Sequence, residues 1–268
     1  MHPRLRTILA ERRLDPDAFA AACRRASEIV GTAGLPSTRM RIAAALMSVP
    51  GGRVCDVGGG VSLYPLVARL MGTEVTVVDA LRGWEGDVRP RVEALSHAGI
   101  RFVEADVETM RLPENAYDAV VAFETIEHLP HSPRPVLEKM VGALVPGGRL
   151  CLSVPNIARL DMRLRLLGGR SPHENVVHFF REGTPFHGHH REYTLDELRW
   201  IAGELGLVGI RGFGVNVTYE SRKPKSALQR LLLRLDDGWG LGDRLLPHRL
   251  RHHAWLEATK PGAGTEPG

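Results

Sequence analysis

The chain has 268 residues, 43% of them hydrophobic and 25% charged, a composition that suits one large globular domain. No segment approaches the roughly 20 consecutive apolar residues of a membrane helix, and the first residues lack the apolar core of a secretory signal. The net charge is +4. The basic residues, mostly arginine, are spread along the chain, which argues against a dedicated nucleic-acid surface.

The three cysteines are Cys23, Cys55 and Cys151. An odd number cannot form a fully paired disulfide framework, and the second and third lie within apolar runs. They are predicted to be small buried apolar residues of a protein in a reducing compartment. The predicted location is therefore the cytoplasm.

Residues 1–50 are predicted to form an N-terminal helical cap. Apolar residues such as Ile8, Phe19 and Ile29 recur at helical intervals, and the pattern is interrupted between residues 31 and 36. A further helix is predicted over about residues 37–47, because Pro50 and two glycines follow it.

Residues 51–260 alternate between strand and helix patterns. Strands are predicted at 54–57, 74–79, 100–105, 117–123, 149–154, 207–215 and 254–259. Helices are predicted at 63–70, 88–97, 136–144, 194–205 and 227–235. Strands that are apolar throughout and alternate with helices predict an α/β fold, with a mostly parallel, doubly wound sheet covered on both faces. The Gly/Pro-rich tail, residues 261–268, is predicted to be disordered.

A glycine-rich turn follows the first strand of this domain. Asp56 precedes Gly58 and Gly60, and these glycines let the backbone approach a ligand closely. The dinucleotide fingerprint G-x-G-x-x-G fails because Leu63 stands at its third glycine position, so an NAD-dependent oxidoreductase is disfavoured. A carboxylate here repels a pyrophosphate and attracts an ammonium or sulfonium group.

Two further acids follow the next strands. Asp79 ends the second strand and is placed to accept hydrogen bonds from ribose hydroxyls, while Asp106 after the third strand can accept one from a base amino group. The alternative is structural: the glycines form a tight turn and the acids cap helices. Ligands of parallel sheets bind at the carboxyl ends of the strands, which favours the binding interpretation.

The motif Asp56-x-Gly58-x-Gly60, with Asp79, Asp106, the block 117–124 and the block 144–150, resembles the class I S-adenosylmethionine-dependent methyltransferase family. The resemblance covers about residues 38–215 and 254–260, and it implies a Rossmann-like fold that binds S-adenosylmethionine. It implies that Asp56 and the glycines lie near the methionine moiety and Asp79 near the ribose. Asp106 and the Val107 amide would contact the adenine, and Phe123 is a further predicted cofactor contact. Ser62 departs from the family, which often has a third glycine there.

A cluster of potential ligands follows the fourth strand. Glu124, Glu127 and His128 fall within five residues, and about 60 residues later His189 lies in a second histidine-rich segment. Carboxylates and imidazoles suit a divalent ion such as Mg²⁺ or Mn²⁺, which would bind two neighbouring acceptor oxygens and lower the pKa of the attacking hydroxyl. In the alternative without a metal, Glu127 caps a helix and His128 positions the acceptor or acts as a base.

This cluster is similar to the Glu-x-x-Glu-His segment of ubiquinone-pathway O-methyltransferases. It is also similar to small-RNA 3′-terminal 2′-O-methyltransferases, whose downstream His-x-x-x-x-Thr setting matches His189 and Thr194. The resemblance implies catalytic roles for Glu127, His128 and His189. Because such folds carry insertions after the fifth strand, residues 156–192 are interpreted as a lid over the acceptor pocket, the alternative being a surface elaboration with solvated arginines.

The predicted function is O-methylation of a small-molecule or glycan-like hydroxyl, such as a vicinal diol or catechol, with S-adenosylmethionine as methyl donor. Two alternatives stay open: 2′-O-methylation of an RNA 3′ end, and a non-catalytic domain that binds the cofactor and a partner protein. The sequence does not identify the acceptor or the oligomeric state.

Overall fold

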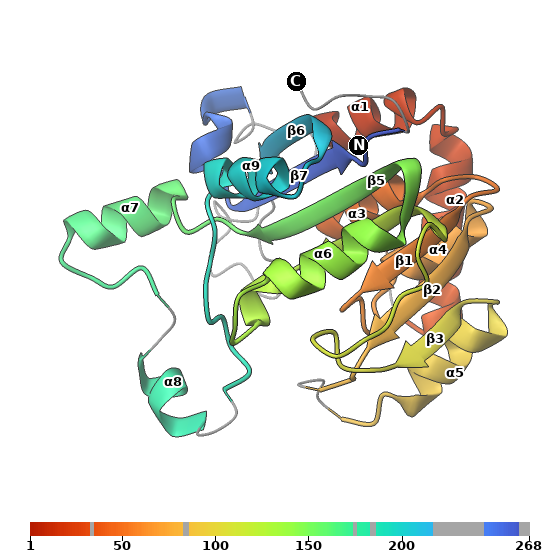
Figure 1. Ribbon diagram of the computed structural model, residues 1–268, viewed down its shortest axis with the longest axis horizontal. Helices are drawn as coiled ribbons and strands as arrows, with labels where there is room; N and C mark the ends of the chain where they lie inside the picture. The colour runs from red at the N-terminus through yellow and green to blue at the C-terminus, as the bar shows by residue number, and fades with distance from the viewer. Residues whose placement is uncertain (33–34, 83–85, 174–175, 183–185, 217–243, 263–268) are drawn as a thin grey trace.

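The computed structural model describes residues 1–32, 35–82, 86–173, 176–182, 186–216 and 244–262. Its centre is a seven-stranded sheet in the order β3-β2-β1-β4-β5-β7-β6 (Figure 1). The strands span Arg53–Val57 (β1), Glu74–Asp79 (β2), Arg101–Glu104 (β3), Tyr117–Phe123 (β4), Leu144–Pro155 (β5), Val208–Val215 (β6) and His253–Thr259 (β7). The pairings from β3 to β5 are parallel, whereas β7 is antiparallel to β5 and β6. The predicted α/β fold with a mostly parallel sheet is confirmed.

The helices flank this sheet on both faces. They span Pro3–Glu11 (α1), Pro16–Val30 (α2), Thr38–Met47 (α3), Tyr64–Leu70 (α4), Arg89–His97 (α5), Arg134–Ala143 (α6), Leu160–Leu167 (α7), Val176–Glu182 (α8) and Leu195–Glu204 (α9), with short 3₁₀ helices at Ile126–His128 (η1) and His248–Leu250 (η2). Two begin at side-chain caps that the sequence signals. The Ser37 hydroxyl accepts the Met40 N–H before α3, and Thr194 forms a capping box with Glu197 before α9.

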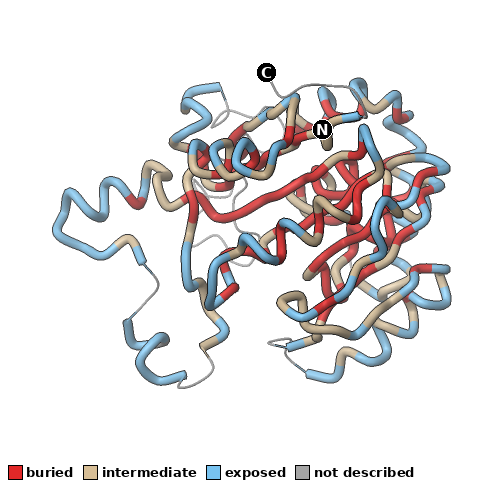
Figure 2. Tube along the Cα trace, viewed as in Figure 1, coloured by how far each residue is buried: buried red, intermediate tan, exposed pale blue. Residues whose placement is uncertain are grey.

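Side chains of successive strand residues point to opposite faces and supply two separate cores. Val54 of β1 belongs to the core that α1 to α5 cover, whereas Cys55 and Val57 belong to the core that α6 and α9 cover. In Figure 2 the central strands are red, and α7 and α8 are largely pale blue. Each fully buried aliphatic side chain stabilises the fold by about 1.5–3 kcal/mol.

The first three helices pack onto the same core as the sheet. α1 contacts α3, and α2 and α3 contact α4, so the N-terminal residues cover one face of the parallel strands. An ion pair between Arg12 and Glu257 of β7 joins this layer to the sheet, and Arg149 lies 3.6 Å from the same carboxylate. The interruption between α1 and α2, where Asp15 caps α2, was absent from the sequence prediction.

One further sequence prediction is wrong, and one segment contains helices where the sequence predicted neither a helix nor any other element. Strand β5 begins at Leu144 rather than after the glycines, because Leu144 pairs with Tyr117 and Arg149 with Ala119, so residues 145–148 bulge from the strand. The polar connection 156–192 contains α7 and α8, which project from the body of the protein (Figure 1). The predicted helix 227–235 and the tail 263–268 lie outside the described residues.

All three cysteines are described, buried and unpaired, as predicted. Burial raises the pKa of the Cys23 thiol to about 11, so this group is not a nucleophile at neutral pH. Among the described helices, none is long and apolar enough to span a bilayer.

Candidate active site

The turn after β1 forms a cradle at the carboxyl edge of the sheet. Gly58 and Gly60 have φ values of +76° and +53°, which favour glycine. A Cβ on Gly58 would overlap the Thr125 side chain, and a Cβ on Gly59 would overlap the Asp56 carboxylate. The glycines therefore let the backbone lie against the end of β4 and against a buried acid.

Asp56 is fully buried beneath this turn. Within the described part of the chain, neither of its carboxylate oxygens has a hydrogen-bond donor. Burial and the neighbouring Asp79 raise its pKa well above the ordinary value of 3.8. A cationic group bound over the turn would stabilise the ionised carboxylate, so this site suits a sulfonium or ammonium ligand.

The acids after β2 and β3 reach the same edge. Main-chain N–H groups hold Asp79, and that of Leu81 lies 2.5 Å from Oδ1. Burial raises the Asp79 pKa, although the N–H groups of Leu81 and Gly60 oppose the shift. Asp106 is partly exposed, and its Oδ2 lies 2.7 Å from the Arg82 guanidinium. Both acids thus stand at strand ends, as predicted.

The two remaining predicted cofactor contacts differ in burial. Val107 follows Asp106 and is partly buried against the core that α6 covers. Phe123 ends β4 inside the opposite core, where its ring centroid lies 5.6 Å from that of Tyr64 and 5.3 Å from that of Trp255. The Phe123 ring is therefore a core group, and a cofactor contact from this residue stays a prediction.

Glu124 lies directly after β4 in the left-handed region, with φ +54°. Its carboxylate accepts a hydrogen bond from Ser153 at 2.8 Å and pairs with Arg39 and His253, each at 3.2 Å. Burial by itself would raise the Glu124 pKa, but His253, Arg39 and the Ser153 hydrogen bond lower it to about 2. Glu124 is thus an internal counter-ion that joins α3, β5 and β7.

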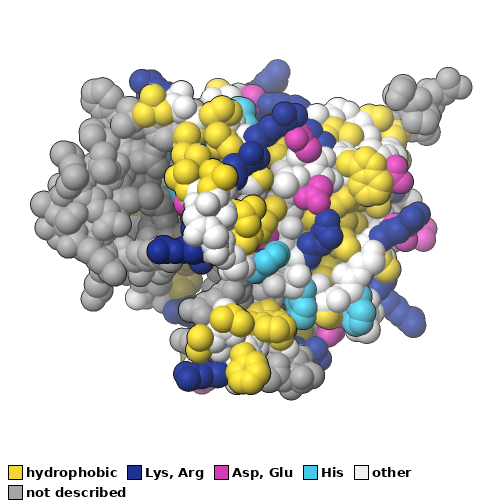
Figure 3. Space-filling model, turned by 90° about the vertical axis from the view of Figure 1, so that its left-hand side faces the viewer, with side chains coloured by type: hydrophobic (Ala, Val, Ile, Leu, Met, Phe, Trp, Pro, Cys, Tyr) yellow, Lys and Arg dark blue, Asp and Glu magenta, His cyan; other side chains and the backbone are white. Residues whose placement is uncertain are grey.

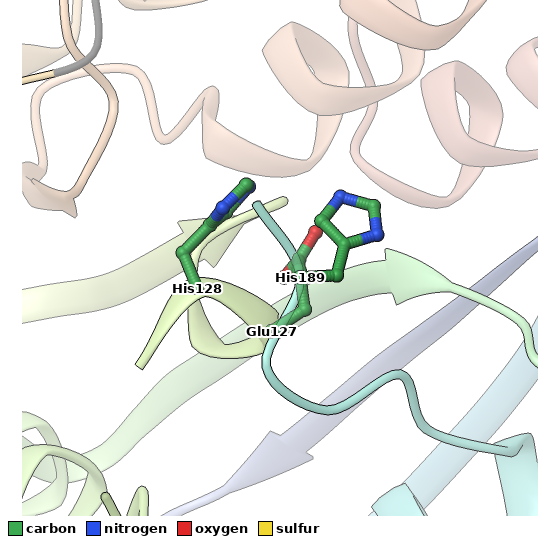
Figure 4. Close-up of side chains that lie close together, drawn as sticks. All are labelled: Glu127, His128 and His189. Carbon is green, nitrogen blue, oxygen red and sulfur yellow. The ribbon is translucent and has the colours of Figure 1, made fainter. Parts of the chain in front are cut away.

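The other three predicted ligands gather in one group (Figure 4). Glu127 and His128 come from η1 and His189 from the segment before α9. One ligand atom from each lies within 4.8 Å of the others. Glu127 is fully buried, and across the described residues no other residue donates a hydrogen bond to its carboxylate oxygens. Burial and the neighbouring Glu124 raise the Glu127 pKa well above 4.5.

Main-chain hydrogen bonds hold the two halves of this group together. His190 and Arg191 donate their N–H groups to the Glu127 carbonyl at 2.8 and 3.3 Å. His128 Nδ1 lies 3.0 Å from the His187 carbonyl oxygen. Because a carbonyl only accepts, Nδ1 carries the proton and the lone pair is on Nε2. Partial desolvation and the adjacent His189 lower the His128 pKa from its ordinary value of 6.5, although part of the residue is exposed to solvent.

A cavity of about 960 Å³ extends from this group between α6 and α9. His189 and Glu192 line it beside the cluster. Its apolar wall comprises Leu129, Leu137, Tyr193, Trp200, Ile201 and Leu205. The cavity therefore offers room and apolar surface for a small molecule next to the buried carboxylate.

The chain matches a family model described as a methyltransferase domain over residues 33–211, more than half of its length. The chain belongs to this family. It is a class I S-adenosylmethionine-dependent methyltransferase, as the resemblance implied. The oxidoreductase alternative is thereby set aside.

The methyltransferase is similar to proteins named ubiquinone biosynthesis O-methyltransferase. The one from Xanthomonas campestris pv. campestris (strain B100) is 31% identical over 206 residues, covering 73% of this chain and 82% of the relative. The one from Xylella fastidiosa (strain M23) is 29% identical, covering 52% and 54%.

Solved structures support the fold of the methyltransferase. A possible histamine N-methyltransferase from Thermotoga maritima superposes with a TM-score of 0.53 at 14% identity, covering 90% of this chain and 96% of that one. Phosphoethanolamine N-methyltransferase 2 from Haemonchus contortus, solved with S-adenosyl-L-methionine, gives a TM-score of 0.53 at 15% identity, covering 96% and 60%. At this identity the likeness concerns the fold alone.

Sequence reasoning missed three residues of the site. Ser153 and His253 bind Glu124 from β5 and β7, and Glu192 lies against His189. The strand residues carry no signal in the sequence, because His253 is 129 residues from its partner. For Glu192, the spacing of three from a histidine before a capping box was an available signal.

Proposed function

We propose that the methyltransferase transfers a methyl group to a hydroxyl oxygen of a small-molecule acceptor at the group formed by Glu127, His128 and His189. The observation that carries this proposal is the fully buried Glu127 carboxyl, which receives no hydrogen bond from any other described residue and lies beside two imidazoles. The name of the Xanthomonas relative, an O-methyltransferase, supports an oxygen acceptor.

The three residues fit a divalent metal ion. One carboxylate and two imidazoles suit Mn²⁺, and the neutral state of His128 leaves its lone pair available. Burial that makes an ionised Glu127 unfavourable is offset when a cation lies beside it. When bound, such an ion lowers the pKa of the acceptor hydroxyl. Of the four residues predicted as ligands, Glu124 is already paired with Arg39 and His253.

The chain's own residues then orient the acceptor and receive its proton. Methyl transfer breaks the carbon–sulfur bond of the sulfonium and forms a carbon–oxygen bond, and the hydroxyl must lose its proton. The Glu127 carboxylate oxygen that is not bound to the ion is the group placed to accept that proton, because the ion would take the single lone pair of His128. The sulfonium becomes a neutral thioether as its carbon–sulfur bond breaks, and the proton released by the hydroxyl carries the positive charge away.

The rest of the acceptor is proposed to lie in the cavity between α6 and α9. Figure 3 views the side of the protein that carries α7, α8 and α9, where hydrophobic side chains are interspersed with basic, acidic and histidine side chains. We propose residues 156–192 as the lid over this pocket and residues 1–50 as the cap that covers the cofactor side of the sheet.

The experiment compares catechol with its monomethyl ether as acceptors, using the full chain, S-adenosylmethionine and either Mn²⁺ or a chelator. Metal-assisted binding of two neighbouring oxygens predicts transfer to catechol that the chelator abolishes. The monomethyl ether, with one hydroxyl, should react on the order of 100-fold more slowly. Glu127→Gln should lose catechol methylation but keep S-adenosylhomocysteine affinity, whereas Glu114→Gln, which changes an exposed acid before the first residue of β4, should behave as wild type.

The outcomes separate the mechanisms. If transfer to catechol is equally fast with Mn²⁺ and with the chelator, the metal-assisted mechanism is excluded. His128 would then act as a base without a metal. Methylation of an RNA 3′ end, but of no small molecule, would show that the acceptor is RNA and not a small molecule. Absence of transfer to every acceptor, with S-adenosylhomocysteine still bound, would favour a non-catalytic domain.

A further inference from the structure

Glu192 stands beside the proposed metal site without belonging to its ligand group. It lies three residues after His189, and its Oε1 is 3.0 Å from the Nδ1 of that imidazole. The two side chains are only 11% and 20% exposed. Within the described structure, the other Glu192 oxygen has no hydrogen-bond partner. The carboxylate is therefore held in a half-buried position by its contact with His189.

This contact determines which nitrogen of His189 carries a proton. A carboxylate oxygen accepts, so Nδ1 donates, and the ring's lone pair is then on Nε2. His128 reaches the same tautomer through the carbonyls of His187 and Gly188, at 3.0 and 3.2 Å. The ring centroids of the two histidines are 4.9 Å apart and nearly perpendicular. Two different acceptors thus impose the same tautomer on neighbouring rings.

The backbone that carries His189 is held by other bonds. The N–H groups of His190 and Arg191 bind the Glu127 carbonyl, and Tyr193 pairs with Asn156. None of these contacts involves the Glu192 side chain. Replacing Glu192 should therefore leave the segment in place and remove only the contact at His189 Nδ1.

We infer that Glu192 is a positioning residue, which holds His189 in the Nδ1–H tautomer and in the orientation that a divalent cation at Glu127, His128 and His189 requires. Carboxylates behind metal-binding histidines restrict the ring and increase its basicity, and their loss typically weakens metal binding about 10–100-fold. This inference rests on the metal site proposed above. It adds a residue that is not itself a ligand of the proposed metal.

The first test needs no metal. Long-range ¹H–¹⁵N NMR of the full chain, with the His189 resonance assigned by His189→Gln, reads the tautomer directly. Wild type should show the Nδ1–H form, Glu192→Gln should retain it because an amide oxygen still accepts, and Glu192→Ala should lose it. An Nε2–H ring in wild type, or an unchanged ring in Glu192→Ala, would overturn the positioning role.

The second test is calorimetric titration of Mn²⁺ into the protein bound to S-adenosylhomocysteine. Glu192→Ala should weaken Mn²⁺ binding 10–100-fold, with Glu192→Gln between it and wild type and Glu114→Ala, at an exposed acid outside the cavity, within twofold of wild type. Affinity for S-adenosylhomocysteine should not change. Equal Mn²⁺ affinity in wild type and Glu192→Ala overturns this inference alone. Absence of Mn²⁺ binding in wild type overturns the proposed metal site together with it.

Discussion

The proposed cofactor side and the proposed acceptor side of this methyltransferase are built in different ways. On the cofactor side, Asp56 and Asp79 belong to adjacent parallel strands, and hydrogen bonds of the sheet set their spacing. On the acceptor side, Glu127 meets His189 across an irregular segment, through main-chain bonds and side-chain contacts. The first side needs a regular sheet, whereas the second needs one particular loop conformation.

This difference explains why the sequence predicts the residues of the two sides to different extents. Cofactor binding uses geometry that every sheet of this type has, so its acids can be located from strand ends. Acceptor recognition uses side chains on connections, which vary without loss of the fold. Substitutions in the turn after β1 are therefore expected to weaken cofactor binding, whereas substitutions on the acceptor side should leave cofactor binding unchanged.

The largest effect is expected for Gly59→Ala. The new methyl group would overlap the buried Asp56 carboxylate, so the turn or the carboxylate must move and S-adenosylhomocysteine binding should fall by at least about 100-fold. Calorimetry measures the affinity. Gly142→Ala is the matched control, because a Cβ there meets nothing within 4 Å and Gly142 lies in α6. Ordinary affinity in Gly59→Ala would show that the turn does not form the cofactor cradle.

Asp79→Ala should weaken S-adenosylhomocysteine binding on the order of 100-fold, because two hydrogen bonds to a charged acceptor are lost. The fold should persist, since Asp79 lies at the end of its strand. Calorimetry and thermal unfolding report the two quantities. Asp87→Ala, which removes an exposed carboxylate, serves as the control. Full affinity in Asp79→Ala would contradict the assignment of the ribose to this residue.

The pH dependence of stability should separate the two sides. Asp56 and Glu127 have pKa values raised above 3.8 and 4.5 in the fold, so above those values the unfolded chain releases protons that the folded chain keeps. Stability of the ligand-free protein should therefore fall as pH rises from about 5 towards the raised values, by at most about 1.4 kcal/mol per pH unit for each group.

Two variants show which carboxyl causes the decrease of stability with pH. Asp56→Asn should remove the loss of stability with rising pH that comes from Asp56, which a bound sulfonium should also reduce. Glu127→Gln should remove the loss that comes from Glu127, which Mn²⁺ should also reduce. Thermal unfolding between pH 5 and 8 is the measurement. A stability that rises with pH in ligand-free wild type, or slopes that neither variant reduces, would show that these carboxyls are not protonated in the fold.

The smallest effect is expected for Leu167→Ser in α7. Leu167 is 84% exposed, so its removal should change the free energy of unfolding by less than about 0.5 kcal/mol. Leu137→Ala in α6, where the side chain is fully buried, should cost about 2–5 kcal/mol. If residues 156–192 cover the acceptor, Leu167→Ser raises the acceptor KM without changing cofactor affinity. An unchanged KM would argue against a lid.

Much of the fold follows from local patterns. Continuous apolar runs located all seven strands, and Thr194 and Glu197 marked the start of α9. The sequence misplaced the start of β5, because Pro146 and two glycines end a helix as readily as they form a bulge. It also missed α7 and α8, which are short and lack a continuous buried face.

By itself, the sequence determined the order of the elements and the carboxylates at the strand ends, since both depend on residues that are neighbours in the chain or in a regular sheet. Only the tertiary structure decided that Glu124 is paired with Arg39 and His253, whereas Glu127 is buried beside two imidazoles. These two acids are three residues apart, and the sequence offers both equally as ligands. Their burial and partners come from strands and loops distant in the chain, and those contacts set their charge.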